Sequence, residues 1–233
     1  MSQSRLVARN AIFRGGGEII AKLASLGFYV VMARELGNEG FGAFMFALSF
    51  TSVLVLASGF GLDDLIAREV SREKTRTHGM LSNVVALRCL TAVPLIGVGV
   101  LVVVLGDYST EVVIAFTLVG IGVAVENISH SWYAVLQAFE RMEIVSVAVI
   151  VQRTLVAAAG IAVLLAGGGL VPTAAVFMAG AVVGQLGVAW ALPRFVFRPR
   201  VSIDRSKWLG LVKAGIPIGL NVVLFTALLK IDQ

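Results

Sequence analysis

The sequence has little cysteine, histidine and charge for its length, and each shortage excludes a class of protein. Its 233 residues include one cysteine, Cys89, and two histidines. A single cysteine cannot form an intramolecular disulfide or a cysteine metal cluster, and two histidines with no matching ligand set do not make a zinc site. Charged residues make up 14% of the chain, whereas an ordinary soluble domain has about a quarter. The composition therefore argues against a soluble domain.

Motifs of covalent chemistry are also missing. The sequence contains no Ser–His–Asp arrangement, no phosphate-cradling P-loop and no dinucleotide fingerprint. We therefore expect a protein that is not an enzyme and that needs no cofactor. The net charge of +5 does not indicate a nucleic-acid partner, because the basic residues lie in short segments between apolar blocks.

Apolar residues dominate the chain, at 58% of all residues. They form long blocks, each close to the roughly 20 residues that a helix needs to cross the hydrocarbon core of a bilayer. Breaks in hydrophobicity predict an all-α, polytopic membrane bundle. Its six full spans are at 10–33, 41–62, 81–105, 111–138, 144–166 and 172–193, and most of a seventh lies at 209–230.

The distribution of lysine and arginine predicts the orientation of these spans. Alternate connections are rich in basic residues, whereas the others contain Arg34 alone, with none around Asp107 or in the Gly167–Gly169 turn. Cytoplasmic loops carry the excess of basic residues, so we expect a cytoplasmic N-terminus in the cell membrane. No small-residue cleavage site follows a clean apolar core, so we expect no removable signal peptide. The basic residues assigned to the cytoplasmic side are Arg5, Arg9, Arg68, Arg72, Lys74, Arg76, Arg141, Arg194, Arg198, Arg200, Arg205 and Lys207.

The first span carries three charges at intervals of four residues, Arg14, Glu18 and Lys22. On a helix they share one face, and charges inside a membrane usually look into a bundle or a cavity. Two interpretations stay open. Glu18 bridges both neighbours and holds the helix, or the face is cationic and attracts an anionic substrate. Arg14 can also extend to the cytoplasmic surface.

Two further arginines lie inside predicted spans, Arg88 and Arg153. Each is about two turns from a cytoplasmic end, so each can reach the surface or project into a shared cavity. With Lys22 they would form a positive lumen, which suits a phosphate-bearing substrate because arginine offers bidentate donors and lysine a point charge. Arg14, Lys22, Arg88 and Arg153 are therefore the candidate substrate-binding residues.

The fourth span carries a polar stripe of Glu126, His130, Tyr133 and Gln137, at spacings of four, three and four residues. One interpretation is a site that responds to protons or cations, because histidine titrates near neutrality. The other, which we favour, is hydrogen bonding between helices, with Glu126 paired to a basic residue of another helix. With Glu18, these residues are candidates for ion coupling or for structural polar contacts.

Residues at the ends of spans have simpler expected roles. Asp63 and Asp64 follow the second span, where we expect them to cap it or to meet Arg68. Gly180 and Gly184 form a GxxxG pattern, which lets helix backbones approach closely.

Four segments, taken in order, resemble a known family. They are ARELGNEGFG at 33–42, GLDDLIAREVSR at 61–72, LQAFERM at 136–142 and Gly215-Ile216-Pro217. In that order they look like the polysaccharide-biosynthesis (O-antigen type) flippases of the multidrug/oligosaccharidyl-lipid/polysaccharide exporter superfamily. Asn38 stands where the family often has proline, and Asp232 matches a common acidic position.

The resemblance implies two six-helix lobes around a central cavity and alternating access that carries a lipid-linked sugar to the outer leaflet. It divides this chain into a six-helix lobe at 1–193, a basic cytoplasmic linker at 194–208 and the truncated start of a second lobe at 209–233. The implied partners are a lipid-linked glycan substrate, membrane lipids and a missing second lobe. Two alternatives stay open, a cation-coupled multidrug-type exporter and a truncated membrane fragment that does not transport.

Overall fold

The computed structural model describes residues 3–59, 61–196, 201–217 and 219, and their side chains except those of 3–18, 20, 56–58 and 195. Six α-helices and two short 3₁₀ helices occupy these residues, and no strand occurs among them. The fold is all-α, as the sequence predicts. The helices are α1 (Gln3–Gly59), α2 (Leu62–Arg72), α3 (Thr77–Leu105), α4 (Thr110–Ala138), α5 (Met142–Leu165) and α6 (Leu170–Phe195), with η1 (Lys74–Arg76) and η2 (Arg205–Lys207).

Five of the described helices are long and apolar enough to cross a membrane. The first of these segments, Ala21–Val55, lies within α1 and contains parts of two predicted spans. Gly37 divides α1 into two arms, because its backbone leaves the helical region with φ of 66°. The bundle therefore contains six long helical segments, as predicted. Residues 208–217 begin the seventh span in helical form, and most of that span lies outside the described residues.

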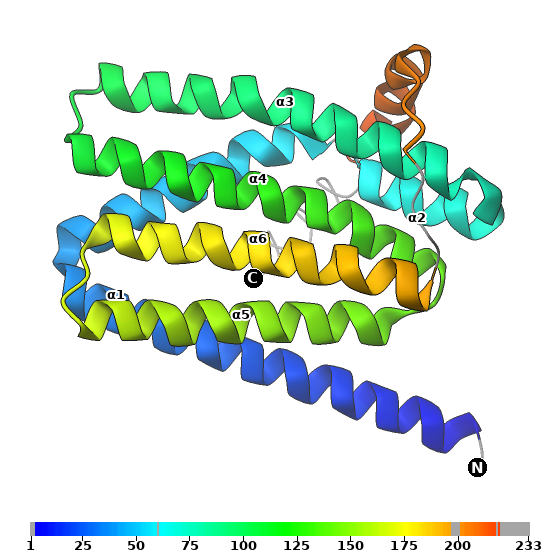
Figure 1. Ribbon diagram of the computed structural model, residues 1–233, viewed down its shortest axis with the longest axis horizontal. Coiled ribbons are helices and arrows are strands. Elements are labelled where there is room, and N and C mark those ends of the chain that lie inside the picture. The colour runs from blue at the N-terminus through cyan, green and yellow to red at the C-terminus, as the bar shows by residue number, and fades with distance from the viewer. Residues whose placement is uncertain (1–2, 60, 197–200, 218, 220–233) are drawn as a thin grey trace, which may run out of the picture.

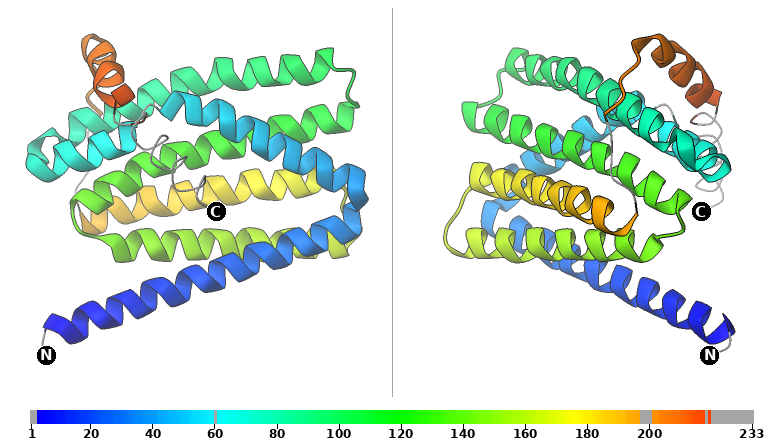
Figure 2. Two further views of the ribbon diagram at one scale, coloured as in Figure 1. Left: turned by 180° about the vertical axis from the view of Figure 1, so that it is seen from behind. Right: turned by 45° about the vertical axis from the view of Figure 1, so that its right-hand side comes forward.

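The long helices run side by side in one bundle with two distinct ends (Figure 1). The α3–α4 and α5–α6 turns lie at one end together with the Gly37 kink, and α2 and the α4–α5 turn lie at the other (Figure 1). We call the second the α2 end. It carries the connections predicted to be cytoplasmic. Figure 2 shows that the first arm of α1 crosses the outside of the bundle, where α1 packs on α5 and α4.

Aromatic rings and small residues pack the centre of the bundle. Phe44 and Phe116 are fully buried, and Phe44 makes edge-to-face contacts with Phe28 and Phe177. A Cβ on Gly122 would come within 2.9 Å of the Phe177 ring. Helix association in lipid depends on such close van der Waals packing, since lipid is as apolar as the side chains themselves. This packing fixes the side chains of the candidate site that lies beside it.

Helix α2 is an amphipathic helix that the span prediction does not include. Its buried residues Leu62, Leu65, Ile66 and Val70 recur at helical spacing, and they pack on α3 and α4. The chain turns into α2 at Gly61, whose φ of 65° lies in the left-handed region. Beyond this bend α2 lies at one end of the bundle, beside the start of α3 (Figure 1).

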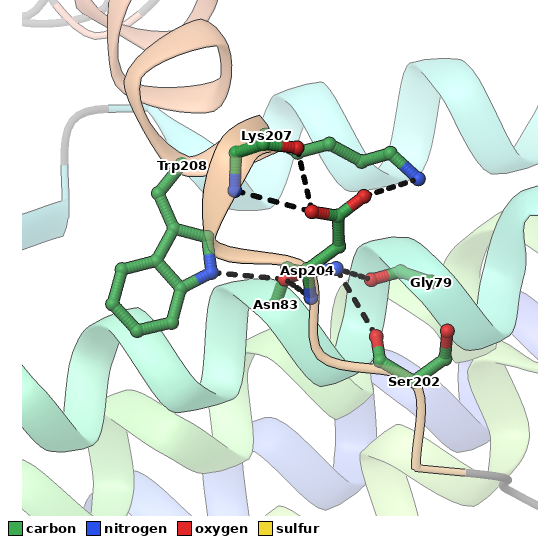
Figure 3. Close-up of polar contacts among 7 residues, drawn as sticks. Gly79, Asn83, Ser202, Asp204, Lys207 and Trp208 are labelled. Carbon is green, nitrogen blue, oxygen red and sulfur yellow. Dashed lines mark hydrogen bonds and ion pairs between the residues drawn. The ribbon is translucent and has the colours of Figure 1, made fainter.

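The segment after α6 docks against the first turns of α3. The side chain of Asn83, which is 2% exposed, accepts hydrogen bonds from the amide of Asp204 at 2.7 Å and the indole of Trp208 at 2.9 Å. Its amide donates to the carbonyl oxygens of Gly79 and Ser202 (Figure 3). Asp204 in turn forms an ion pair with Lys207, with 3.2 Å between Oδ2 and Nζ. Residues 201–208 therefore form a fixed connection, which we call the docked linker.

Candidate functional site

A polar cavity of about 290 Å³ lies inside the bundle, between α1, α4, α5 and α6. Phe28, Leu48, Val156 and Phe177 supply much of its apolar wall. Ligand sites are typically apolar cavities of this kind with a few placed polar groups. The polar groups here are Ser25, Tyr29, Glu126, Gln152 and Arg153.

Glu126 and Gln152 are joined across the contact between α4 and α5. The Gln152 amide donates a hydrogen bond of 2.8 Å to Oε1 of Glu126. Gly184 of α6 makes room for this arrangement, because a Cβ there would lie 2.7 Å from Oε1 of Gln152. Glu126 is thus hydrogen-bonded between helices, and its donor is the amide of Gln152 rather than a basic residue.

Arg153 follows Gln152 on α5 and lines the same cavity as Glu126. The cavity wall therefore presents a guanidinium and a carboxyl group. An arginine in such a place can donate two parallel hydrogen bonds to a phosphate, and the carboxylate can accept from hydroxyl groups. The cavity can therefore bind a ligand that carries both an anionic group and hydroxyls.

The polar face of α1 reaches this cavity. Lys22, Ser25 and Tyr29 follow one another at spacings of three and four residues, so they share a helix face. Ser25 and Tyr29 line the cavity, and Lys22 is an exposed residue one turn before them. Arg14 and Glu18 precede it at the predicted spacing, and their side chains lie outside the described residues.

Arg88 lies in a different cluster, at the α2 end. Its side chain is 1% exposed and pairs with the carboxylate of Asp63 on α2 at 2.9 Å. It also donates to the Ser131 hydroxyl at 2.7 Å and to the carbonyl of Asn127, both on α4. Arg88 does not line the polar cavity, so the structure places Arg153 and Arg88 apart. Asp63 meets Arg88 rather than Arg68 or a helix cap, which corrects the expectation for that residue.

The polar stripe of α4 does not form one site. Glu126 lines the cavity, whereas Tyr133 packs against an apolar cluster that includes Leu136 and Val188. His130 contacts the Tyr133 ring edge-on, with centroids 5.8 Å apart, and Gln137 is exposed. Within the part of the chain that the structure describes, no group of three potential metal ligands comes together.

Sequence reasoning did not select three of the five polar cavity residues, Ser25, Tyr29 and Gln152. Ser25 and Tyr29 continue the face of Arg14, Glu18 and Lys22 by one heptad, and following that face would have found them. Gln152 precedes Arg153 in an otherwise apolar span, and a lone intramembrane amide is a signal of a contact between helices.

The chain is similar to one described family and to one solved transporter. The model of a family described as polysaccharide biosynthesis protein matches residues 7–233. A structure described as the outward-facing conformation of a multidrug resistance MATE family transporter of the MOP superfamily is similar with a TM-score of 0.65 and 18% sequence identity. That match covers 88% of this chain and 49% of the transporter, so this chain spans about half its length. At this identity the likeness shows the fold.

No curated protein matches the sequence. The family match covers nearly the whole chain, and the described helices have the length and apolar character of membrane spans. The chain is a membrane protein that belongs to the polysaccharide biosynthesis family.

Proposed function

We propose that this protein moves a lipid-linked oligosaccharide, a precursor of a surface polysaccharide, across the cell membrane by alternating access. The chain would supply the N-terminal lobe of the transporter, with its N-terminus in the cytoplasm. Membership of the polysaccharide biosynthesis family supports this function. The structural likeness to a transporter supports the mode of action, because two lobes that rock about a central site give alternating access without covalent chemistry.

The observation that carries the proposal is Arg153 in the wall of a polar cavity within a membrane bundle. A charged side chain within a membrane-spanning helix is costly unless it faces a polar pathway or has a partner. A lipid-linked glycan has an anionic phosphate linkage and sugar hydroxyls. Arg153 would hold the phosphate, and Glu126 with Gln152 would contact hydroxyl groups of the first sugar.

The test is made in the cell that encodes the protein. Deleting the gene should cause the lipid-linked oligosaccharide to accumulate, protected from a lectin added outside the membrane. The native gene and Arg153→Lys should restore lectin access, and Arg153→Gln should not. Arg34→Gln is the control, because Arg34 is exposed and does not line the cavity. Full restoration by Arg153→Gln would contradict the role of Arg153, and undiminished lectin access after the deletion would contradict the function.

A second candidate is cation-coupled export of a small molecule, and Glu126 favours it. Glu126 is the carboxylate among the cavity-lining residues, so a proton or cation taken up there would change the charge beside Arg153. Glu126→Gln keeps an acceptor for Gln152 but removes the charge. Export that loses its dependence on an imposed proton gradient in this variant would support this candidate, and an unchanged dependence would count against it.

A further inference from the structure

A second hollow, separate from the polar cavity, lies at the α2 end of the bundle. Its volume is about 660 Å³, and its walls come from α2, η1, residues 79–83 of α3 and residues 207–214. We call it the interface cleft. It shares no lining residue with the polar cavity. The segment at 205–217, which contributes one wall, stands outside the bundle beside α3 (Figures 1 and 2).

The wall at 207–214 is held in place by contacts at both of its ends. The Asn83 network fixes the docked linker to α3, and the backbone of Gly215 packs closely on Gly61. Between these contacts the cleft stays open, because a Cβ on Gly79 of α3 or on Gly210 of the facing wall would meet no atom within 4 Å. Ligand sites are usually preformed hollows of this kind.

The cleft lies at the level of the phospholipid headgroups. Helix α3 has 29 residues, which span about 44 Å, whereas the hydrocarbon core of a bilayer is about 30 Å thick. The first turns of α3 therefore project from the core, and Gly79 and Met80 belong to them. Leu65, Met80 and Leu211 give the cleft apolar walls, so a ligand that fits it has an apolar part as well as a polar one.

The polar residues of the cleft carry both signs of charge. Arg76 of η1 and Lys207 of η2 line it from two different walls. Each is paired with a carboxylate outside the lining, Arg76 with Glu73 and Lys207 with Asp204 (Figure 3). The two cations therefore leave no excess of positive charge, which an anionic ligand would need for electrostatic complementarity.

Glu69 is the carboxylate that lines the cleft, and its side chain is 26% exposed. Its contacts with basic groups are long, 3.4 Å to Nη1 of Arg76 and 3.8 Å to Nη1 of Arg72. Ordinary N–H···O hydrogen bonds measure about 2.7–3.2 Å, and a carboxylate has about four lone-pair sites. Glu69 can therefore accept hydrogen bonds from an ammonium group in the cleft.

We propose that the interface cleft binds the headgroup of phosphatidylethanolamine, a lipid with a phosphate and a primary ammonium group. Glu69 accepts from the ammonium, and Lys207 and Arg76 donate to the phosphate. The glycerol ends of the acyl chains lie against Met80 and Leu211. The bound lipid joins α2 and η1 to the wall at 207–214, and so holds the docked linker on the bundle.

The pattern of charges favours this lipid over other membrane phospholipids. Phosphatidylcholine has a fully methylated nitrogen and donates no hydrogen bond to Glu69. Phosphatidylglycerol has no cation for Glu69, and its net negative charge meets cations that are already balanced. The proposal requires a membrane around the bundle but no particular substrate, so it can fail while the proposed function holds.

Photolabelling of the 233-residue chain in nanodiscs of phosphatidylcholine tests the proposal. The probe is a phosphatidylethanolamine with a diazirine near the glycerol end of one acyl chain, and labelled peptides are mapped by mass spectrometry. We expect labels concentrated in residues 65–83 and 207–214. Replacing part of the phosphatidylcholine by unlabelled phosphatidylethanolamine should reduce the labels, and replacing the same part by phosphatidylglycerol should not.

Glu69→Gln is the principal variant, and Glu73→Gln is its matched control. Both remove a carboxylate that pairs with Arg76, but Glu73 does not line the cleft. Loss of one charge-assisted hydrogen bond should weaken labelling about tenfold in Glu69→Gln. The Glu73→Gln variant should label like the native chain.

Two further pairs of variants test the volume and the phosphate contact. Gly79→Leu fills the cleft and should reduce labelling, whereas Gly97→Leu adds the same volume elsewhere on α3, where a Cβ also meets no atom within 4 Å. Lys207→Gln should weaken labelling, whereas Asp204→Asn breaks the same ion pair but keeps the ammonium, and should retain it. Thermal unfolding identifies a variant that fails to fold, and the Glu69→Gln result then decides.

Three outcomes would overturn the proposal. They are equal labelling of the Glu69→Gln and Glu73→Gln variants, equal competition by phosphatidylglycerol and phosphatidylethanolamine, and full removal of the labels by soluble phosphoethanolamine. The last would show that the cleft takes a soluble ligand rather than a lipid. A failure of the proposed function appears instead in the lectin experiment on the deleted gene.

Discussion

Arg88 and Asp63 form an ion pair between α3 and α2, with 2.9 Å between Nη2 and Oδ2. The guanidinium is almost fully buried, whereas the aspartate side chain is 39% exposed. The same guanidinium donates to Ser131 and Asn127 of α4. One side chain therefore joins three helices at the α2 end and fixes the bend after the second arm of α1.

Removing one partner of this pair should destabilise the bundle. In Asp63→Asn, Arg88 stays buried without its counter-charge, and we expect a loss of about 3 kcal/mol in the free energy of unfolding, near the low end for broken buried pairs because Asp63 is partly exposed. The double variant Asp63→Asn with Arg88→Met should be more stable than the single one. Thermal unfolding in detergent measures both. Glu69→Gln, at an exposed pair with Arg76, should change stability by less than about 1 kcal/mol.

Gly61 should tolerate no side chain. Its φ of 65° is left-handed, and a Cβ there would lie 2.7 Å from the carbonyl oxygen of Gly215 and 2.9 Å from Cα of Gly219. The left-handed conformation alone costs about 1–2 kcal/mol for a non-glycine residue, so Gly61→Ala should lose at least that much stability. Gly97→Ala should be neutral or slightly stabilising, because Gly97 lies in a helix with open space. Equal unfolding midpoints for the two variants would contradict this account.

The contact of Gly61 with Gly215 shows what the sequence could and could not reveal. Each residue belongs to a segment that carries the family resemblance, but neither segment shows by itself that it touches the other. The spans were predictable because each has its own apolar run. Pairing between segments more than a hundred residues apart depends on how the bundle folds, and hydrophobicity carries no information about it.

The candidate site was predictable in part for the same reason. Glu126 and Arg153 are conspicuous because charge is rare in apolar spans, and both line the cavity. Arg88 is equally conspicuous, yet it belongs to another cluster because it pairs with Asp63 of α2. From the sequence we expected Asp63 to cap the second span or to meet Arg68. The sequence did not indicate that the bend at Gly61 would carry a carboxylate into the bundle.

Asn83 should control the docked linker. Three of its hydrogen bonds go to Ser202, Asp204 and Trp208, and each is worth about 1 kcal/mol. Asn83→Ala should therefore favour opening of the linker by about 3 kcal/mol, which raises the rate of tryptic cleavage after Arg205 and Lys207 on the order of a hundredfold.

Ser82→Ala is the control, because it removes a single hydrogen bond to the docked linker. Ser82 accepts one bond from the linker, from the Ser202 amide at 3.1 Å, so its loss should speed cleavage much less than the loss of Asn83. Cleavage at the native rate in Asn83→Ala would show that apolar contacts of Trp208 and Leu211 hold the linker without the polar network.

The stability of the docked linker should depend on pH only below the usual pKa of aspartate. Hydrogen bonds from Ser206 and then from Lys207 lower the pKa of Asp204 below its usual 3.8. A carboxyl group with a lowered pKa contributes stability that is fully present above its unfolded-state pKa and is lost as the pH falls through its folded-state pKa. Between pH 5 and 8 the contribution of Asp204 to the stability of the docked linker should therefore be constant.

Amide hydrogen exchange at residues 201–208, compared between the native chain and Asp204→Asn, measures this contribution. We expect a protection difference that is constant above pH 5 and is lost as the pH falls below the usual 3.8 of aspartate. A difference that changed near pH 6 would assign the effect to another group, because the pKa of Asp204 is lowered below 3.8.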